Sequence, residues 1–305
     1  MEAVKNKISS YLADVADLLR RYGCFMTGVG LSNGKTGVAL FLYRYSRLFN
    51  KPELTEYANE IMLEVMDDIS GDIPLEYDYG LSGIGVAISY LINNDYLDRD
   101  SEVVLAQFDD LIMNNQDNSD IADLHTLISV AYYWRARRSS ERLEKLVHRI
   151  HSMCKNRLIF ENVPAARQEM MRSLTLFYVM NAVILDKKNV IVGDREIVNY
   201  LNSPETVEYV KTGRWCDKYI YRKYVDDTIT FPIHDDITLR DIISLSLKKL
   251  ECGLPIPKVA YFEKVRQIML DANLLKQLID LVNIQSLGLG SSMSGLAWAL
   301  LEYEE

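Results

Sequence analysis

Apolar residues recur along most of the chain with the spacing of helices rather than that of strands. From Pro52 to Ile69 the apolar positions favour the helical period, which predicts an amphipathic helix with Pro52 near its start. The same period predicts further amphipathic helices at 102–114, 141–154, 205–212 and 258–282. Only 189–192 and 228–231 have a strand-like composition. The expected fold class is therefore all-α.

A second population of helices is more apolar and alternates with the first. These stretches are 36–49, 83–93, 123–135, 170–185, 239–250 and 293–303, and we expect their helices to start near Ser32, Ser82, Asp123, Met170, Leu239 and Ser291. Helices that are apolar nearly all round are expected to be buried on both sides. An alternation of inner and outer helices predicts an α/α toroid, a double ring of helices, and an open helical solenoid is the alternative.

Glycine-led segments introduce three of these apolar helices. They are 30–39, 80–87 and 288–297, with Gly and Leu at the same leading offsets. Such a repeat indicates an array of similar helical units. We expect Ser32 and Ser82 to cap helix N-termini. We also expect close helix contacts at Gly37, Gly85 and Gly295. No linker rich in Pro, Gly or Ser divides the chain, which predicts a single domain over residues 1–305.

Composition narrows the function classes. The chain has 305 residues, is 49% hydrophobic and carries a net charge of -9, and no basic stripe is present that would neutralise nucleic-acid phosphates. We find no apolar run of about eighteen residues, so no membrane span is expected. The N-terminus does not resemble a signal peptide, and four widely spaced cysteines fit a reducing compartment. A cytoplasmic location is expected.

The glycine-led repeats resemble those of the lanthionine synthetase C-like family, the cyclases of ribosomal peptide modification. The resemblance covers roughly 28–156 and returns at the C-terminal repeat, where Gly288 to Leu301 is similar to the family's last inner helix. It implies a single α/α toroid, a peptide or precursor peptide as ligand, and a peptide-modifying enzyme as a partner.

The family's chemistry depends on zinc held by two cysteines and a histidine, with the fourth position open to the substrate. Here Cys216 stands where the first ligand is expected, but no Cys-His-Gly segment follows. Cys252 lacks an adjacent histidine, and His234 is the nearest one in sequence. We therefore expect that Cys216, His234 and Cys252 do not converge, that no cofactor is bound, and that the protein is a degenerate, peptide-binding relative. An active cyclase with an unusual zinc site is the alternative.

Polar residues at the mouth of the expected ring are the candidate ligand site. Glu76 and Asp78 directly precede one apolar helix, and we expect them, with Ser32 and Ser82, to contact a peptide. A second alternative is a carbohydrate-active toroid, in which these carboxylates face partners at 226–227 and 235–236, Asp226, Asp227, Asp235 and Asp236. A nucleotide site at the Gly-Lys-Thr segment 34–36 is not expected, because the phosphate-loop pattern lacks its first glycine.

Overall fold

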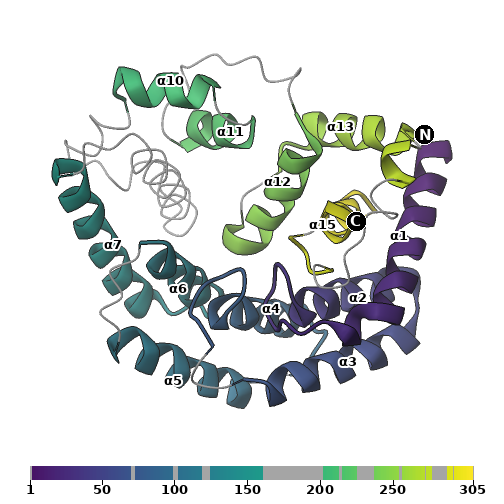
Figure 1. The fold of residues 1–305 in the computed structure, drawn as a ribbon, viewed down its shortest axis with the longest axis horizontal. Helices are drawn as coiled ribbons and strands as arrows, with labels where there is room; N and C mark the ends of the chain where they lie inside the picture. The colour runs from purple at the N-terminus through teal and green to yellow at the C-terminus, as the bar shows by residue number, and fades with distance from the viewer. Residues whose placement is uncertain are drawn as a thin grey trace. The chain divides into compact units, whose positions relative to one another are not determined.

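The computed structural model describes residues 2–69, 73–98, 102–118, 124–160, 202–212, 215–224, 237–253, 256–271, 273–276, 287–290 and 292–304. Within these ranges every regular element is helical, and the prediction of an all-α protein is confirmed (Figure 1). The predicted helix at 170–185 and the strand-like segments 189–192 and 228–231 lie outside the described residues. No helix in the described part is long and apolar enough to cross a membrane.

The chain forms two compact units. Unit 1 comprises Met1–Ile121 and Pro257–Glu305, and unit 2 comprises Ala122–Ile256. The helices of unit 1 are α1 (Glu2–Tyr22), the short η1 (Gly23–Phe25), α2 (Lys35–Phe49), α3 (Pro52–Asp67), α4 (Leu81–Asn93), α5 (Glu102–Asn118), α13 (Lys258–Leu270) and α15 (Ser292–Glu304). Those of unit 2 are α6 (Leu124–Ala136), α7 (Ser140–Phe160), α10 (Pro204–Thr212), α11 (Trp215–Tyr224) and α12 (Leu239–Cys252). The single domain and the toroid stay predictions.

Most helix starts fall close to the expected positions. Helices α3 and α12 begin at the predicted residues, Pro52 and Leu239, and α4 begins one residue before Ser82. The expected helix at 258–282 is shorter, because α13 ends at Leu270. Asp271 there has extended backbone, and its carboxylate accepts hydrogen bonds from the amides of residues 273 and 274, which caps a new turn.

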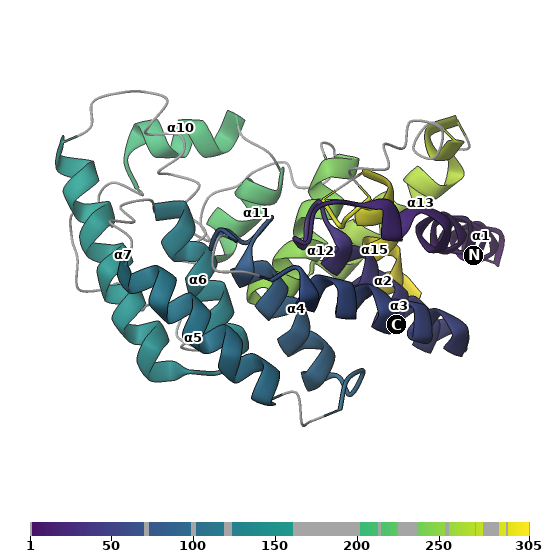
Figure 2. The same ribbon diagram turned by 60° about the horizontal axis from the view of Figure 1, so that its bottom comes forward.

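In unit 1 the apolar helix α2 is more fully buried than the amphipathic helix α3 that packs against it. Helix α2 packs against α3, α4 and α15, and α4 packs against α5 (Figure 1). Helix α3 runs alongside α2 in both views and buries one face only (Figure 2). By contrast, α2 is buried from Lys35 to Ser46 without a break. The hydrophobic effect accounts for both helices, because each one buries the apolar side chains of its sequence: α3 on one face and α2 on all sides.

Unit 1 combines an N-terminal and a C-terminal segment of the chain, and their helices pack together. From the C-terminal segment, α15 packs against α1 and α2, and α13 packs against α1. The Tyr11 hydroxyl of α1 donates to the Met293 carbonyl oxygen at 3.2 Å, and the Tyr261 hydroxyl of α13 donates to the Ala299 carbonyl oxygen at 3.0 Å. Burial raises the pKa of Tyr11 above its ordinary value, so this hydroxyl keeps the proton that it donates.

Unit 2 has its own core around α6, which packs against α7 and α12. Trp134 of α6 is fully buried, with the Tyr133 ring edge-on at 4.9 Å between centroids. The guanidinium of Arg142 in α7 lies 4.4 Å from the centre of the Trp134 ring, a cation–π contact across the two helices. Helix α11 packs against α10 and α12.

A capping box starts α12, and its loss has a predictable cost. The Thr238 hydroxyl oxygen accepts from the Asp241 amide at 3.2 Å, and the Thr238 amide donates to the Asp241 carboxylate at 2.9 Å. We expect Thr238→Ala to lower the free energy of unfolding by about 1 kcal/mol, because one helix amide loses its acceptor. Urea unfolding followed by circular dichroism measures this. Thr238→Ser should retain most of the stability, and equal losses in both variants would contradict the capping role.

Candidate functional site

Three loops that precede α2, α4 and α15 meet in unit 1, and we call this meeting point the glycine junction. It comprises residues 28–34, residues 74–83, which include the first turn of α4, and residues 287–290. The Ser32 amide donates to the Asp78 carbonyl oxygen at 2.9 Å, which joins the first two loops. The Gly290 amide donates to the Ser32 carbonyl oxygen at 2.7 Å, which joins the third. The three glycine-led repeats of the sequence are therefore neighbours in space.

Glycine is required where these loops touch. A Cβ atom at Gly288 would lie 2.5 Å from the Ser32 carbonyl oxygen and 2.7 Å from the Gly34 amide nitrogen, closer than any side chain allows. A Cβ atom at Gly37 would collide with the Leu31 carbonyl oxygen and lie 2.9 Å from the Leu289 amide nitrogen. Gly37 was expected at a helix–helix contact. The crowding is instead between the first turn of α2 and loop backbone.

Ser32 and Asp78 form the centre of the junction. The Ser32 hydroxyl donates to the Asp78 carboxylate, and Asp78 is half-buried. The prediction that Ser32 and Ser82 cap helices is wrong, because the N-cap residues of α2 and α4 are Gly34 and Gly80, and neither helix has a side-chain cap. The reason is positional: the Ser32 hydroxyl bonds across to another loop, and Ser82 already lies inside α4.

Glu76 of the second loop and Ser82 in the first turn of α4 flank this centre. The Gly80 amide donates to the Glu76 carbonyl oxygen at 2.9 Å, which closes the turn before α4. Among the described residues, neither the buried Glu76 Oε2 nor the buried Ser82 Oγ has a hydrogen-bond partner. The Tyr79 side chain is 58% exposed beside them. The junction thus offers half-buried carboxylates, a hydroxyl and an open aromatic ring on a rigid backbone.

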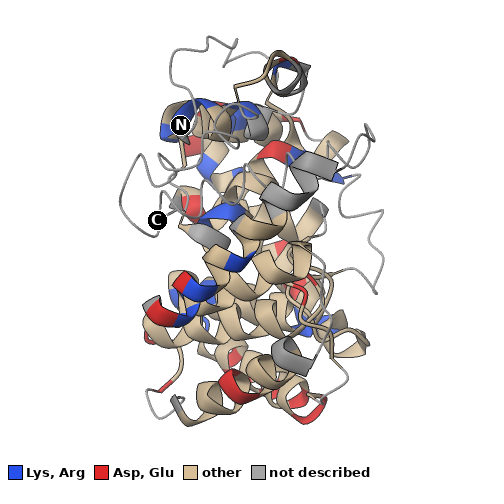
Figure 3. Ribbon diagram, turned by 90° about the vertical axis from the view of Figure 1, so that its left-hand side faces the viewer, with Lys and Arg blue, Asp and Glu red and all other residues tan. Residues whose placement is uncertain are grey.

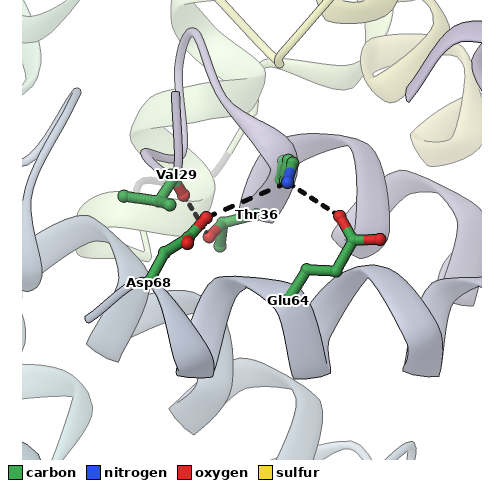
Figure 4. Close-up of polar contacts among 5 residues, drawn as sticks. Val29, Thr36, Glu64 and Asp68 are labelled. Carbon is green, nitrogen blue, oxygen red and sulfur yellow. Dashed lines mark hydrogen bonds and ion pairs between the residues drawn. The ribbon is translucent and has the colours of Figure 1, made fainter. Parts of the chain in front are cut away.

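The Gly-Lys-Thr segment adjoins the junction, and its side chains are committed to protein contacts (Figure 4). Lys35 has an 11% exposed side chain, and its Nζ lies 2.7 Å from Glu64 Oε2 and 3.9 Å from Asp68 Oδ2. The Thr36 hydroxyl donates to the Val29 carbonyl oxygen. A phosphate would have to displace two carboxylates from Lys35. These contacts, which sequence reasoning missed, tie α3 to the start of α2.

The zinc candidates lie in unit 2 and are only partly described. Cys216 is the second residue of α11, and Cys252 is the last residue of α12, directly before Gly253, whose φ is 67°. His234 lies outside the described residues, as do Asp226, Asp227, Asp235 and Asp236 of the carbohydrate alternative. Within the part of the chain that the structure describes, no group of three His, Cys, Asp or Glu side chains is placed to hold a metal ion.

Charge is distributed over many helices, with Lys and Arg on several of them (Figure 3). Helix α3 carries five acidic residues and no Lys or Arg. Glu64, one of these five acidic residues, pairs with Lys35 beside the junction. Comparisons with known protein families, curated proteins and solved structures find no match for this chain.

Proposed function

We propose that this protein binds a peptide at the glycine junction and acts without zinc, as an accessory protein related to the lanthionine synthetase C-like cyclases. The observation that carries the proposal is the convergence of the three glycine-led loops. Of the residues singled out from the sequence, Ser32, Glu76 and Asp78 belong to two of those loops, and Ser82 lies in the first turn of α4 directly after one of them. The resemblance to the cyclases supports a peptide as the ligand class.

The chemistry of the junction supports a peptide segment with a cationic side chain. A half-buried carboxylate at Asp78 would pair with an ammonium or guanidinium group more strongly than an exposed one, because solvent screens it less. The exposed ring of Tyr79 provides apolar contact and a face for a cation. The loops themselves need little rearrangement, since backbone hydrogen bonds already join them.

Peptide binding is tested by fluorescence anisotropy on the full chain. The probe is a fluorescein-labelled short peptide that contains serine, threonine, cysteine and two lysines, and its counterpart has glutamates in place of the lysines. We expect the lysine peptide to bind more tightly, and Asp78→Asn to weaken it roughly tenfold, as for loss of a charge-assisted contact. Glu56→Gln, an exposed α3 residue, is the matched control. Equal affinity of Asp78→Asn, or preference for the glutamate peptide, would contradict the proposal.

Zinc content separates the binding protein from an active cyclase. We expect purified protein to contain far less than one zinc ion per chain, because the sequence lacks the family's Cys-His-Gly segment. Elemental analysis measures it. Stoichiometric zinc that is lost in Cys216→Ala and retained in Cys24→Ala would overturn the zinc-free proposal and restore catalysis.

A further inference from the structure

Helix α15 is buried on every side, so apolar burial alone does not define how it docks. Every residue from 293 to 301 is buried, and the side chains between Leu296 and Leu301 are all apolar. Six consecutive residues cover the full circumference of a helix. A rotation of α15, or a shift along its axis, would therefore still bury apolar side chains. The amount of buried apolar area alone therefore does not select the observed register.

The hydrogen bonds from α1 and α13 do not discriminate strongly. Tyr11 and Tyr261 both donate to backbone carbonyl oxygens of α15, those of Met293 and Ala299. Every residue of a helix carries such a carbonyl, and another turn offers a similar acceptor. These bonds hold the helix in place without identifying which turn should lie at which partner.

The ion pair between Arg44 and Glu302 does distinguish one turn of α15 from the next. Glu302 is the one acidic or basic residue of α15 before its last residue. Its Oε1 lies 2.8 Å from Arg44 Nη1 of α2, with side chains 9% and 2% exposed. The Arg44 guanidinium also lies 4.6 Å from the centre of the Trp298 ring. A shift of one turn moves Glu302 by about 5.4 Å and leaves two buried charges apart, which is strongly unfavourable.

We propose that the Arg44–Glu302 pair sets the register of α15 on α2 and thereby places 287–290 against Ser32. Arg44 and Glu302 are positioning residues in this account, because they act through the helix and lie away from the junction. The inference bears on the proposed function only because 287–290 form one side of the glycine junction. Buried ionic groups that fix a register are the best-attested use of such pairs.

The double variant Arg44→Leu/Glu302→Leu separates register from stability. Replacing a buried ion pair with apolar residues is often neutral or stabilising, so the urea midpoint should be unchanged or higher. The amide hydrogens of Leu289 and Gly290 should nevertheless exchange roughly tenfold faster, because their acceptors on Leu31 and Ser32 are no longer held in place. Hydrogen exchange followed by NMR on the full chain measures both amides without any peptide.

A matched control uses the Lys35–Glu64 ion pair at the start of α2. Lys35→Met/Glu64→Leu removes a pair that joins α2 to α3, and it should leave the exchange of the Gly290 amide unchanged. Unchanged exchange at Gly290 in the Arg44/Glu302 double variant would overturn the inference. A lower urea midpoint, or failure to fold, would also overturn it, since the pair would then supply stability rather than register. If exchange changes as expected while no peptide binds, the proposed function fails and the register inference stands.

Discussion

Glu302→Ala is expected to lower the free energy of unfolding by about 3–5 kcal/mol, because it leaves the Arg44 guanidinium buried without its carboxylate. The Arg44 side chain is 2% exposed, so water cannot replace the lost partner without disrupting the packing between α2 and α15. Urea unfolding measures the loss. A change below about 1 kcal/mol, the value typical of surface pairs, would contradict the burial of this charge.

Glu64→Gln is the comparison that isolates burial as the cause. The Lys35–Glu64 contact has a similar length, 2.7 Å, but the Glu64 side chain is 47% exposed. Water screens this pair at the exposed Glu64 carboxylate, and the Asp68 carboxylate still lies 3.9 Å from Lys35 Nζ after Glu64 is replaced. We expect a cost of about 0–1 kcal/mol. Equal losses in Glu302→Ala and Glu64→Gln would show that exposure does not govern these pairs.

Gly37→Ala is expected to cost about 1–3 kcal/mol, because the new methyl group has no room. Its Cβ would collide with the Leu31 carbonyl oxygen and lie 2.9 Å from the Leu289 amide nitrogen. Both obstacles are backbone atoms of the glycine junction, and neither can rotate away. Chemical denaturation measures the cost, and the larger Gly37→Leu change should exceed it.

Gly23→Ala provides the matched glycine control. A Cβ at Gly23 would lie 2.9 Å from a methyl group of Val38, and its next neighbours are also side-chain atoms. Side chains can shift by a few tenths of an ångström at low cost, so the loss should be smaller than for Gly37→Ala. An equal or larger loss at Gly23 would contradict the crowding seen at Gly37.

The type and position of the described helices could largely be predicted from the sequence. A helix that buries one face repeats apolar residues at the helical period, and this repeat is visible in the sequence. Pro52 and Leu239 begin helices as expected, since a proline and a Thr-capped turn are local signals. The end of α13 at Leu270 could not be predicted in the same way. The apolar period continues beyond it, and only the cap formed by Asp271 interrupts the helix.

The candidate site was predicted in part. The glycine repeats pointed to Ser32 and Asp78, but nothing local indicated that their side chains bond to each other. Serine at a helix start usually caps the helix, and long-range contact overrides that preference here. Arg44 lies inside the apolar stretch 36–49, and its burial was not predicted. Its partner Glu302 could not be identified, because sequence pattern carries no information on which distant helix packs against it.

The central claim, that peptide binds at the glycine junction, is tested most directly by photocrosslinking at Tyr79. A photoreactive phenylalanine analogue replaces Tyr79, or Tyr22 of α1 as an exposed control. The account predicts that the lysine peptide crosslinks at position 79 and not at position 22, and that excess unlabelled peptide or Asp78→Asn suppresses the product. Saturable binding in solution with no crosslink at position 79, or equal crosslinking at both positions, would contradict it.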